Sequence, residues 1–232
     1  MSATSDPAAP PAPERGPFRL AWYKFVRAEA RLVIGLMGGV GASGVENVPT
    51  GGGALLVSNH ASYWDVIALA VRLPRPLNFV ARSTLFVPLI GPFIHSVGAF
   101  PIQRDGMGSQ GFKETLRRLR AGGIVTLFPE GTRTTDGELQ PMRPGIGTLA
   151  ARSRVSVVPA GLAGTFEAWP RHCRLPRPHP MHVHYGKPIE PADLVGLNPE
   201  AATALVGAKI AEAVATARAA LGGASSKADE LA

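Results

Sequence analysis

The sequence predicts a single α/β domain with a largely parallel mixed sheet flanked by helices. Short apolar runs of strand length alternate with helical segments, and this alternation favours parallel strands joined by helices. The run IVTLF at 124–128 is apolar throughout, as expected for a strand buried on both faces. The length of 232 residues suits one such domain. The predicted strands cover 54–58, 78–81, 99–102, 124–128, 155–161 and 182–185.

Helices are predicted between several of these strands. One over 63–72 follows the first strand, and one over 111–120 places its leucines at helical spacing before the Gly122-Gly123 stop. A last helix is expected over about 199–221. The predicted domain spans 43–222. A lead (1–16) and a tail (223–232) carry few large apolar residues, so we expect both to be disordered.

The segment 17–42 is predicted to be an amphipathic helix that associates with a membrane. At about 100° per residue, its aromatic and large aliphatic residues share one side, opposite Lys24, Arg27 and Arg31. Such a basic helix with aromatic anchors is typical of the membrane interface, and it is too weakly apolar to span a bilayer. The alternative is a helix docked on the protein's own core. The apolar side consists of Phe18, Trp22, Phe25, Leu32, Val33 and Leu36.

A second apolar segment, 85–102, carries no formal charge. Its length would permit a membrane span, but Pro88, Pro92 and Pro101 would interrupt a helix. The segment therefore suits either the core, an acyl-chain groove or a patch that dips into lipid.

The charge of the chain indicates anionic partners. Its formal net charge is +7, yet only 6% of its residues are aromatic, and no common nucleic-acid-binding motif is found. We therefore expect no nucleic acid and favour an anionic membrane surface or phosphorylated substrates. The single cysteine, Cys173, excludes an intrachain disulfide, and the first residues lack the order of a secretory signal. We expect a peripheral protein on the cytoplasmic face of the cell membrane.

The strongest candidate for catalysis is a histidine–aspartate pair directly after the first strand, in the sequence Ser58-Asn59-His60-Ala61-Ser62-Tyr63-Trp64-Asp65. Ligand sites of open α/β sheets lie beyond the carboxyl ends of strands. The two side chains can meet only if His60 lies in the turn and Asp65 in the first helical turn, with Ser62 as N-cap. A carboxylate beside an imidazole fixes its tautomer and stabilises the imidazolium. The alternative is that Asp65 merely satisfies helix-end amides.

Four stretches, in order, resemble the glycerolipid acyltransferases related to bacterial lysophosphatidic acid acyltransferase. The first is the His–four residues–Asp motif at 59–65. The others are GAFPIQR at 98–104, FPEGTR at 128–133 and the apolar-proline stretch VVPA at 157–160. One such motif is a weak signal, whereas four in the right order are a strong one. The similarity covers roughly positions 40 to 190, so the resemblance implies the glycerolipid acyltransferase fold.

The resemblance also implies a reaction. A fatty acyl group would pass from acyl-CoA or acyl-ACP (acyl carrier protein) to the free hydroxyl of 1-acylglycerol-3-phosphate, giving phosphatidic acid. His60 would be the general base and Asp65 its partner. No acyl-enzyme, metal or cofactor is implied. The residues implied in binding the acceptor are Arg104, Glu130, Gly131, Thr132, Arg133 and, more weakly, Arg82. The alternative for Arg133 is a structural role, in which it forms a salt bridge to Glu130.

The sequence departs from the family pattern at two places. Gln103 stands where many members carry Asp or Asn, and Met142-Arg143-Pro144-Gly145 replaces a more usual Phe-Lys-basic-Gly. Both departures keep open another lysophospholipid or a lipid alcohol as acceptor. A non-catalytic protein that binds anionic membranes is the alternative from a different class, and a lipid hydrolase is a third.

Three weaker signals are interpreted as structural. The sequence 145–150 fits GxGxxA but follows a proline instead of a strand, so a dinucleotide site is not expected. His179, His182 and His184 are expected to be solvated, with only the last two on one strand face. Cys173 has no obvious base beside it and is expected to be an ordinary thiol.

Overall fold

The computed structural model describes residues 16–102 and 108–229. The lead predicted over 1–16 lies outside these ranges apart from Gly16, as do the last three residues of the predicted tail.

One sheet forms the centre of the described part of the chain, with strand order β1-β7-β6-β2-β5-β3-β4. All neighbouring strands are parallel except β6 and β7. The predicted α/β class and the largely parallel mixed sheet are therefore confirmed. The strands are β1 (Val40–Ser43), β2 (Ala54–Ser58), β3 (Leu77–Arg82), β4 (Ala99–Ile102), β5 (Ile124–Leu127), β6 (Ser156–Ala163) and β7 (Met181–Tyr185).

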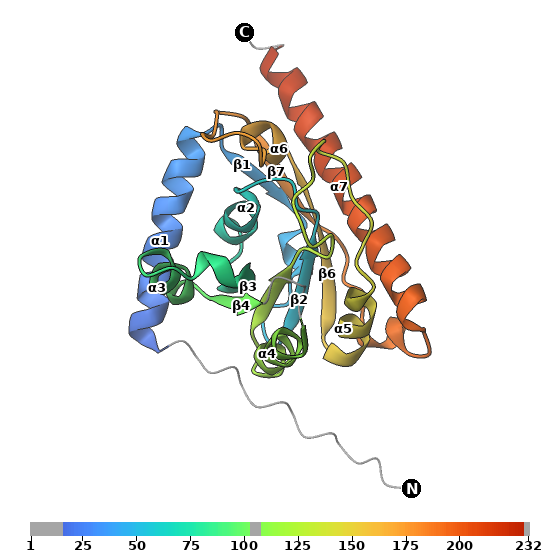
Figure 1. Cartoon of the computed structure of the whole chain (residues 1–232). Helices are drawn as coiled ribbons and strands as arrows, with labels where there is room; N and C mark the ends of the chain where they lie inside the picture. The colour runs from blue at the N-terminus through green and yellow to red at the C-terminus, as the bar shows by residue number, and fades with distance from the viewer. Residues whose placement is uncertain (1–15, 103–107, 230–232) are drawn as a thin grey trace, which may run out of the picture.

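Helices cover both faces of the sheet (Figure 1). Helices α1 and α2 pack on one face, and α4, α5 and α7 on the other. Short 3-10 helices are η1 (Val45–Asn47), η2 (Ser83–Leu85) and η3 (Pro191–Leu194). The α-helices are α1 (Pro17–Leu36), α2 (Asp65–Val71), α3 (Ile90–Ser96), α4 (Gly108–Arg120), α5 (Gly145–Ser153), α6 (Thr165–Ala168) and α7 (Pro199–Asp229).

The central strand β2 shows why the sheet needs continuous apolar runs. Leu56 lies in the core under α1 and α2, whereas Leu55 and Val57 lie in the core under α4, α5 and α7. Every residue of β2 is buried, because both faces of a central parallel strand are covered. On the neighbouring strand β6, Gly161 lets α7 approach closely, since an added Cβ would lie 2.1 Å from the carbonyl carbon of Ala213.

Two predicted boundaries are wrong by several residues. The helix expected over 17–42 ends at Leu36, and residues 40–43 form β1 at the sheet edge. Gly38 and Gly39 have positive φ angles of 101° and 79°, and such glycines end a helix. The sequence VGAS has too little strand propensity to reveal β1 without its partner.

The tail predicted to be disordered from residue 223 is also helical as far as Asp229, because α7 continues through Gly222 and Gly223. A glycine weakens a helix by only about 1 kcal/mol relative to alanine. Earlier in α7, buried Val206, Ile210 and Ala217 anchor the helix to the sheet, so the glycines do not stop it.

Candidate active site

The candidate catalytic residues lie where the parallel strands β2 and β5 end. His60 follows β2, and the loop 128–134 follows β5, which pairs with β2 in register. This is the edge at which open α/β sheets bind ligands. The fold therefore brings two of the sequence motifs together although about 70 residues separate them.

His60 and Asp65 form the predicted pair. The Nδ1 atom of His60 lies 2.8 Å from Oδ2 of Asp65. The Asp65 side chain is fully buried, whereas 22% of the His60 side chain is exposed. The same Oδ2 atom accepts hydrogen bonds from the backbone amides of Ala61 (2.7 Å) and Ser62 (2.8 Å). Asp65 therefore supports the turn and the imidazole together, so the two interpretations of the sequence are compatible.

Helix α2 begins later than predicted. It starts at Asp65 itself, not after a cap at Ser62, although Ser62 Oγ still accepts a hydrogen bond from the amide of Trp64 (3.1 Å). The carboxylate of Asp65 consequently lies at the N-terminus of α2, where the helix dipole favours negative charge.

The pair fixes the orientation of the imidazole ring. The Asp65 carboxylate oxygen can only accept a hydrogen bond, so the Nδ1 atom of His60 carries the hydrogen. The Nε2 atom of the neutral ring therefore keeps its lone pair. The ring also stacks on Phe128, with centroids 4.0 Å apart and planes inclined by 14°. His60 thus presents an unprotonated Nε2 from a partly exposed ring that Asp65 and Phe128 hold in place.

The loop 128–134 also clamps the backbone of His60. The His60 amide donates to Oε1 of Glu130 at 2.5 Å, and the His60 carbonyl accepts from the amide of Thr134 at 2.9 Å. The second carboxylate oxygen, Oε2, accepts from the amide of Gln140 at 2.8 Å. Glu130 is 5% exposed, and both of its oxygens bind backbone amides. The structure thus places Glu130, predicted to bind substrate, as a support for the backbone of His60.

Gly131 and Thr132 form the turn between Glu130 and Arg133. Gly131 has a φ angle of 75°, and an added Cβ there would lie 2.2 Å from Nε of Arg143. Thr132 is half-buried. The backbone therefore turns sharply at Gly131, where Arg143 passes close to it.

Arg133 does not form the salt bridge to Glu130 that the sequence left open. Its guanidinium carbon lies 3.5 Å from the centroid of the Tyr63 ring, a cation–π contact. Within residues 16–102 and 108–223 no carboxylate pairs with it, and its buried Nη1 has no hydrogen-bond partner there. The aromatic ring holds a guanidinium that keeps its capacity to bind an anion.

The other two predicted arginines follow neighbouring strands. Arg82 ends β3, the neighbour of β5, and is exposed at the same sheet edge as Arg133. Arg104 lies outside the described residues, as does Gln103. It comes shortly after β4, whose Ile102 pairs in register with Arg82.

Comparisons with known proteins identify the family. The acyltransferase family model matches residues 40–163, more than half of the chain. A 1-acyl-sn-glycerol-3-phosphate acyltransferase of Bacillus subtilis is 32% identical over 177 residues, which cover 75% of this chain and 86% of that protein. The chain belongs to the acyltransferase family.

Two further relatives agree with this assignment. The chloroplastic 1-acyl-sn-glycerol-3-phosphate acyltransferase LPAT1 of Arabidopsis thaliana is 34% identical, over 66% of this chain and 44% of its own length. The crystal structure of the acyltransferase PlsC from Thermotoga maritima has a TM-score of 0.76 and 21% identity, and covers 88% of this chain and 83% of its own. The latter shows the shared fold. The protein is thus an O-acyltransferase of the PlsC-like family.

Several site residues of the acyltransferase were not predicted. Tyr63 contacts Arg133, Thr134 binds the His60 carbonyl, and Trp169 lies against Tyr63 with ring centroids 4.9 Å apart. Tyr63 stands between the histidine and the aspartate, so its place in the motif was a signal. Trp169 lies over 100 residues further along the chain, and only the fold reveals its position.

The residues set aside from the sequence lie elsewhere. His182 and His184 share a strand face as expected, and both hydrogen bond to Ser43 Oγ, at 3.0 and 2.9 Å. Cys173 is a half-buried free thiol. Gly145 to Ala150 lie in α5, which packs on α7 through its buried residues.

The buried carboxyl group of Glu130 predicts that the stability of the protein depends on pH. Burial raises the pKa of Glu130 to about 7 from 4.5, against the opposing hydrogen bonds from Gln140 and His60. Because the folded pKa exceeds the unfolded one, the stabilisation is complete below pH 4.5 and is lost as pH rises through 7. We expect the free energy of unfolding to fall by about 3 kcal/mol more over this range in the wild type than in Glu130→Gln.

Denaturant titrations at several pH values measure this difference. Glu200→Gln, which removes an exposed carboxylate at the start of α7, is the matched control and should follow the wild-type curve. Parallel curves for the wild type and Glu130→Gln would contradict the assignment.

Proposed function

We propose that this acyltransferase moves a fatty acyl group from acyl-CoA or acyl-ACP to the free hydroxyl of 1-acylglycerol-3-phosphate, giving phosphatidic acid. The relatives named 1-acyl-sn-glycerol-3-phosphate acyltransferase support this acceptor. The observation that carries the proposal is the His60–Asp65 pair at 2.8 Å, at the same sheet edge as the unpaired guanidinium of Arg133.

His60 acts as the general base. Its Nε2 takes the proton of the lipid hydroxyl while the oxygen attacks the thioester carbonyl carbon. The tetrahedral intermediate then expels the thiolate, which takes the proton back from the imidazolium. An ester and a free thiol result, with no acyl-enzyme. Asp65 stabilises the imidazolium between the two proton transfers, as the carboxylate of a catalytic triad does.

The arginines at the sheet edge bind the phosphate of the acceptor. A guanidinium suits this role because its fixed fork of N–H groups matches phosphate oxygens. Arg133 is held by Tyr63, and none of the carboxylates whose side chains are described forms an ion pair with it, so these do not compete with the ligand. Arg82 and Arg104, together with the Gly131-Thr132 turn, complete the proposed acceptor site. The donor is a co-substrate, and the reaction needs no metal or cofactor.

Arg143 favours a second acceptor within the same reaction class. Its side chain crosses Gly131, and its Nε lies 3.4 Å from the Glu130 carbonyl oxygen. It therefore places an additional cation beside the turn expected to meet the headgroup. A lysophospholipid with a larger anionic headgroup would use this extra charge.

We infer that α1 and α3 hold the enzyme on an anionic membrane. The apolar residues predicted to share one side of α1 are all exposed: Phe18, Trp22, Phe25, Leu32, Val33 and Leu36. Instead, α1 docks on the core through Tyr23 and Ile34. A helix that binds the core by one strip and exposes an apolar face beside it is suited to lie at a lipid surface.

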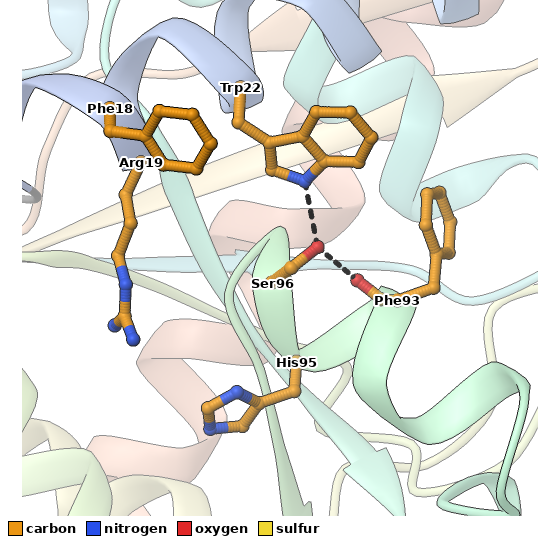
Figure 2. A pocket seen from close by; sticks show the side chains of 6 residues that line it. All are labelled: Phe18, Arg19, Trp22, Phe93, His95 and Ser96. Atoms are coloured by element: carbon orange, nitrogen blue, oxygen red, sulfur yellow. Dashed lines mark hydrogen bonds between the residues drawn. The ribbon is translucent and has the colours of Figure 1, made fainter.

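The second apolar segment, 85–102, extends this face. Its first part exposes five large apolar residues: Leu85, Val87, Leu89, Ile90 and Phe93. Its last part, in β4, buries Ala99 and Phe100. Trp22 joins the two helices, because its Nε1 donates to Ser96 Oγ at 2.9 Å. Figure 2 shows the pocket between them, where Phe18 and Phe93 flank this bond.

The exposed helices support peripheral attachment. No helix among the described residues is long and apolar enough to cross a bilayer. We place the enzyme on the cytoplasmic face of the cell membrane, where the proposed donors are made.

His60→Ala tests the base. We expect turnover to fall by about 10²–10⁴-fold, because the variant lacks the Nε2 atom that takes the proton. Thermal melting and vesicle binding should stay as in the wild type. Thioester consumption is followed with and without lysophosphatidic acid. Near-wild-type turnover in the variant would refute the base, and consumption without lysolipid would indicate a hydrolase.

Exchanging three exposed residues of α1 tests membrane attachment. Phe25→Gln, Leu32→Gln and Leu36→Gln together should weaken flotation with anionic vesicles at least tenfold, because each inserted side chain contributes on the order of 1 kcal/mol. The matched control is Val195→Gln with Leu197→Gln, which are exposed before α7. Equal flotation of the triple variant and the control would contradict the proposed attachment.

A further inference from the structure

The loop 169–180 between α6 and β7 carries a concentration of positive charge. Between Glu167 and Glu190 the sequence contains no acidic residue. The same stretch contains four cations, and all of them are exposed: Arg171, Arg174, Arg177 and Lys187.

This loop is hydrogen-bonded to segments of the candidate active site. The carbonyl of Trp169 accepts hydrogen bonds from Ser62 Oγ (2.8 Å) and from the amide of Tyr63 (3.4 Å). Arg171 Nη1 donates to the carbonyl of Arg133 at 3.3 Å. The basic loop is therefore bound to both motifs that surround His60.

The loop and the acceptor arginines follow strands on different sides of β2, and Arg171 reaches across to the carbonyl of Arg133. His60 follows β2, which lies between β6 and β5. Arg133 follows β5, and Arg82 ends β3 beyond it. The basic loop comes after β6 and before β7, on the opposite side of β2. A base between two cationic sides can receive one anionic substrate from each.

No ion pair neutralises the charges of the loop among the side chains that the structure describes. Over residues 16–102 and 108–223, none of the ion pairs involves Arg171, Arg174 or Arg177. Arg177 instead donates through Nε to the carbonyl of Glu167 at 2.8 Å. Exposed guanidinium groups without acidic partners are suited to bind phosphates.

We propose that Arg171 and Arg174 bind the anionic head of the acyl donor, the phosphate groups that carry the phosphopantetheine thioester. The phosphates would rest on the loop while the extended pantetheine arm brings the thioester carbonyl to the hydroxyl at His60. This site rests on the proposed transferase function, which requires such a donor. It leaves Arg133, Arg82 and Arg104 to the acceptor phosphate.

The test removes the two charges from the full-length enzyme. Arg171→Ala with Arg174→Ala should raise the KM for palmitoyl-CoA about tenfold, because phosphate contacts are lost, and should leave the KM for lysophosphatidic acid within twofold. The assay is run in detergent, with palmitoyl-ACP as a second donor to show which carrier the loop serves. The matched control, Arg120→Ala with Arg152→Ala, removes exposed charge from the opposite sheet edge and should change neither KM.

A binding measurement separates this site from the reaction. Titration calorimetry with adenosine 3′,5′-bisphosphate is made on the His60→Ala background, where no transfer is needed. Binding lost in the double variant and kept in the control supports the site. If the wild type transfers no acyl group from any donor but this pattern of binding holds, the proposed function fails and the anion site stands.

Three results would overturn the inference. The first is an unchanged KM for both donors, and the second is a rise in the acceptor KM alone. The third is weaker flotation on anionic vesicles with unchanged donor kinetics in detergent, which would assign the loop to lipid headgroups. If the double variant misfolds, the single variant Arg174→Glu replaces it, because Arg174 makes none of the described hydrogen bonds or ion pairs. The KM for the donor must then rise in this single variant.

Discussion

One buried oxygen atom joins the ring of His60, the turn after β2 and the helix α2. Asp65 Oδ2 accepts from the His60 ring and from two consecutive backbone amides. A buried carboxylate is costly unless hydrogen-bond donors satisfy it, and here two backbone amides and the imidazole converge on the same oxygen. The aspartate thus couples the local fold to the tautomer of the base. It needs no direct contact with substrate to do so.

The parallel sheet places two further loops beside this local arrangement. Because β2 lies between β5 and β6, the loops that follow these two strands both reach the segment 60–63, and they contact each other through Arg171 and the carbonyl of Arg133. The β5 loop fixes the histidine backbone through Glu130 and presents Arg133. The loop 169–180, which follows β6 and α6, accepts hydrogen bonds from Ser62 and Tyr63 at the Trp169 carbonyl and carries the basic stretch. Both loops are cationic, which agrees with the net charge of +7 and with the proposal that two anionic substrates meet at His60.

Much of this arrangement could be predicted from the sequence, because it depends on local patterns. The apolar strands and the His60–Asp65 spacing are local, and the structure confirms both. The short β1 could not be predicted, since VGAS becomes a strand only beside β7. The role of Glu130 also escaped prediction, because its partners, the amides of His60 and Gln140, meet only after folding. For the same reason the sequence did not show that Tyr63 holds Arg133.

The most direct test of the account is the tautomer of His60. In ¹⁵N-labelled protein, at a pH where the imidazole is neutral, the account predicts a protonated Nδ1 and an unprotonated Nε2. Replacement of Asp65 by asparagine should remove this preference, because the amide no longer supplies a charged acceptor. A neutral His60 ring with its hydrogen on Nε2 in the wild type would contradict the account, since that nitrogen could not take a proton from the lipid hydroxyl.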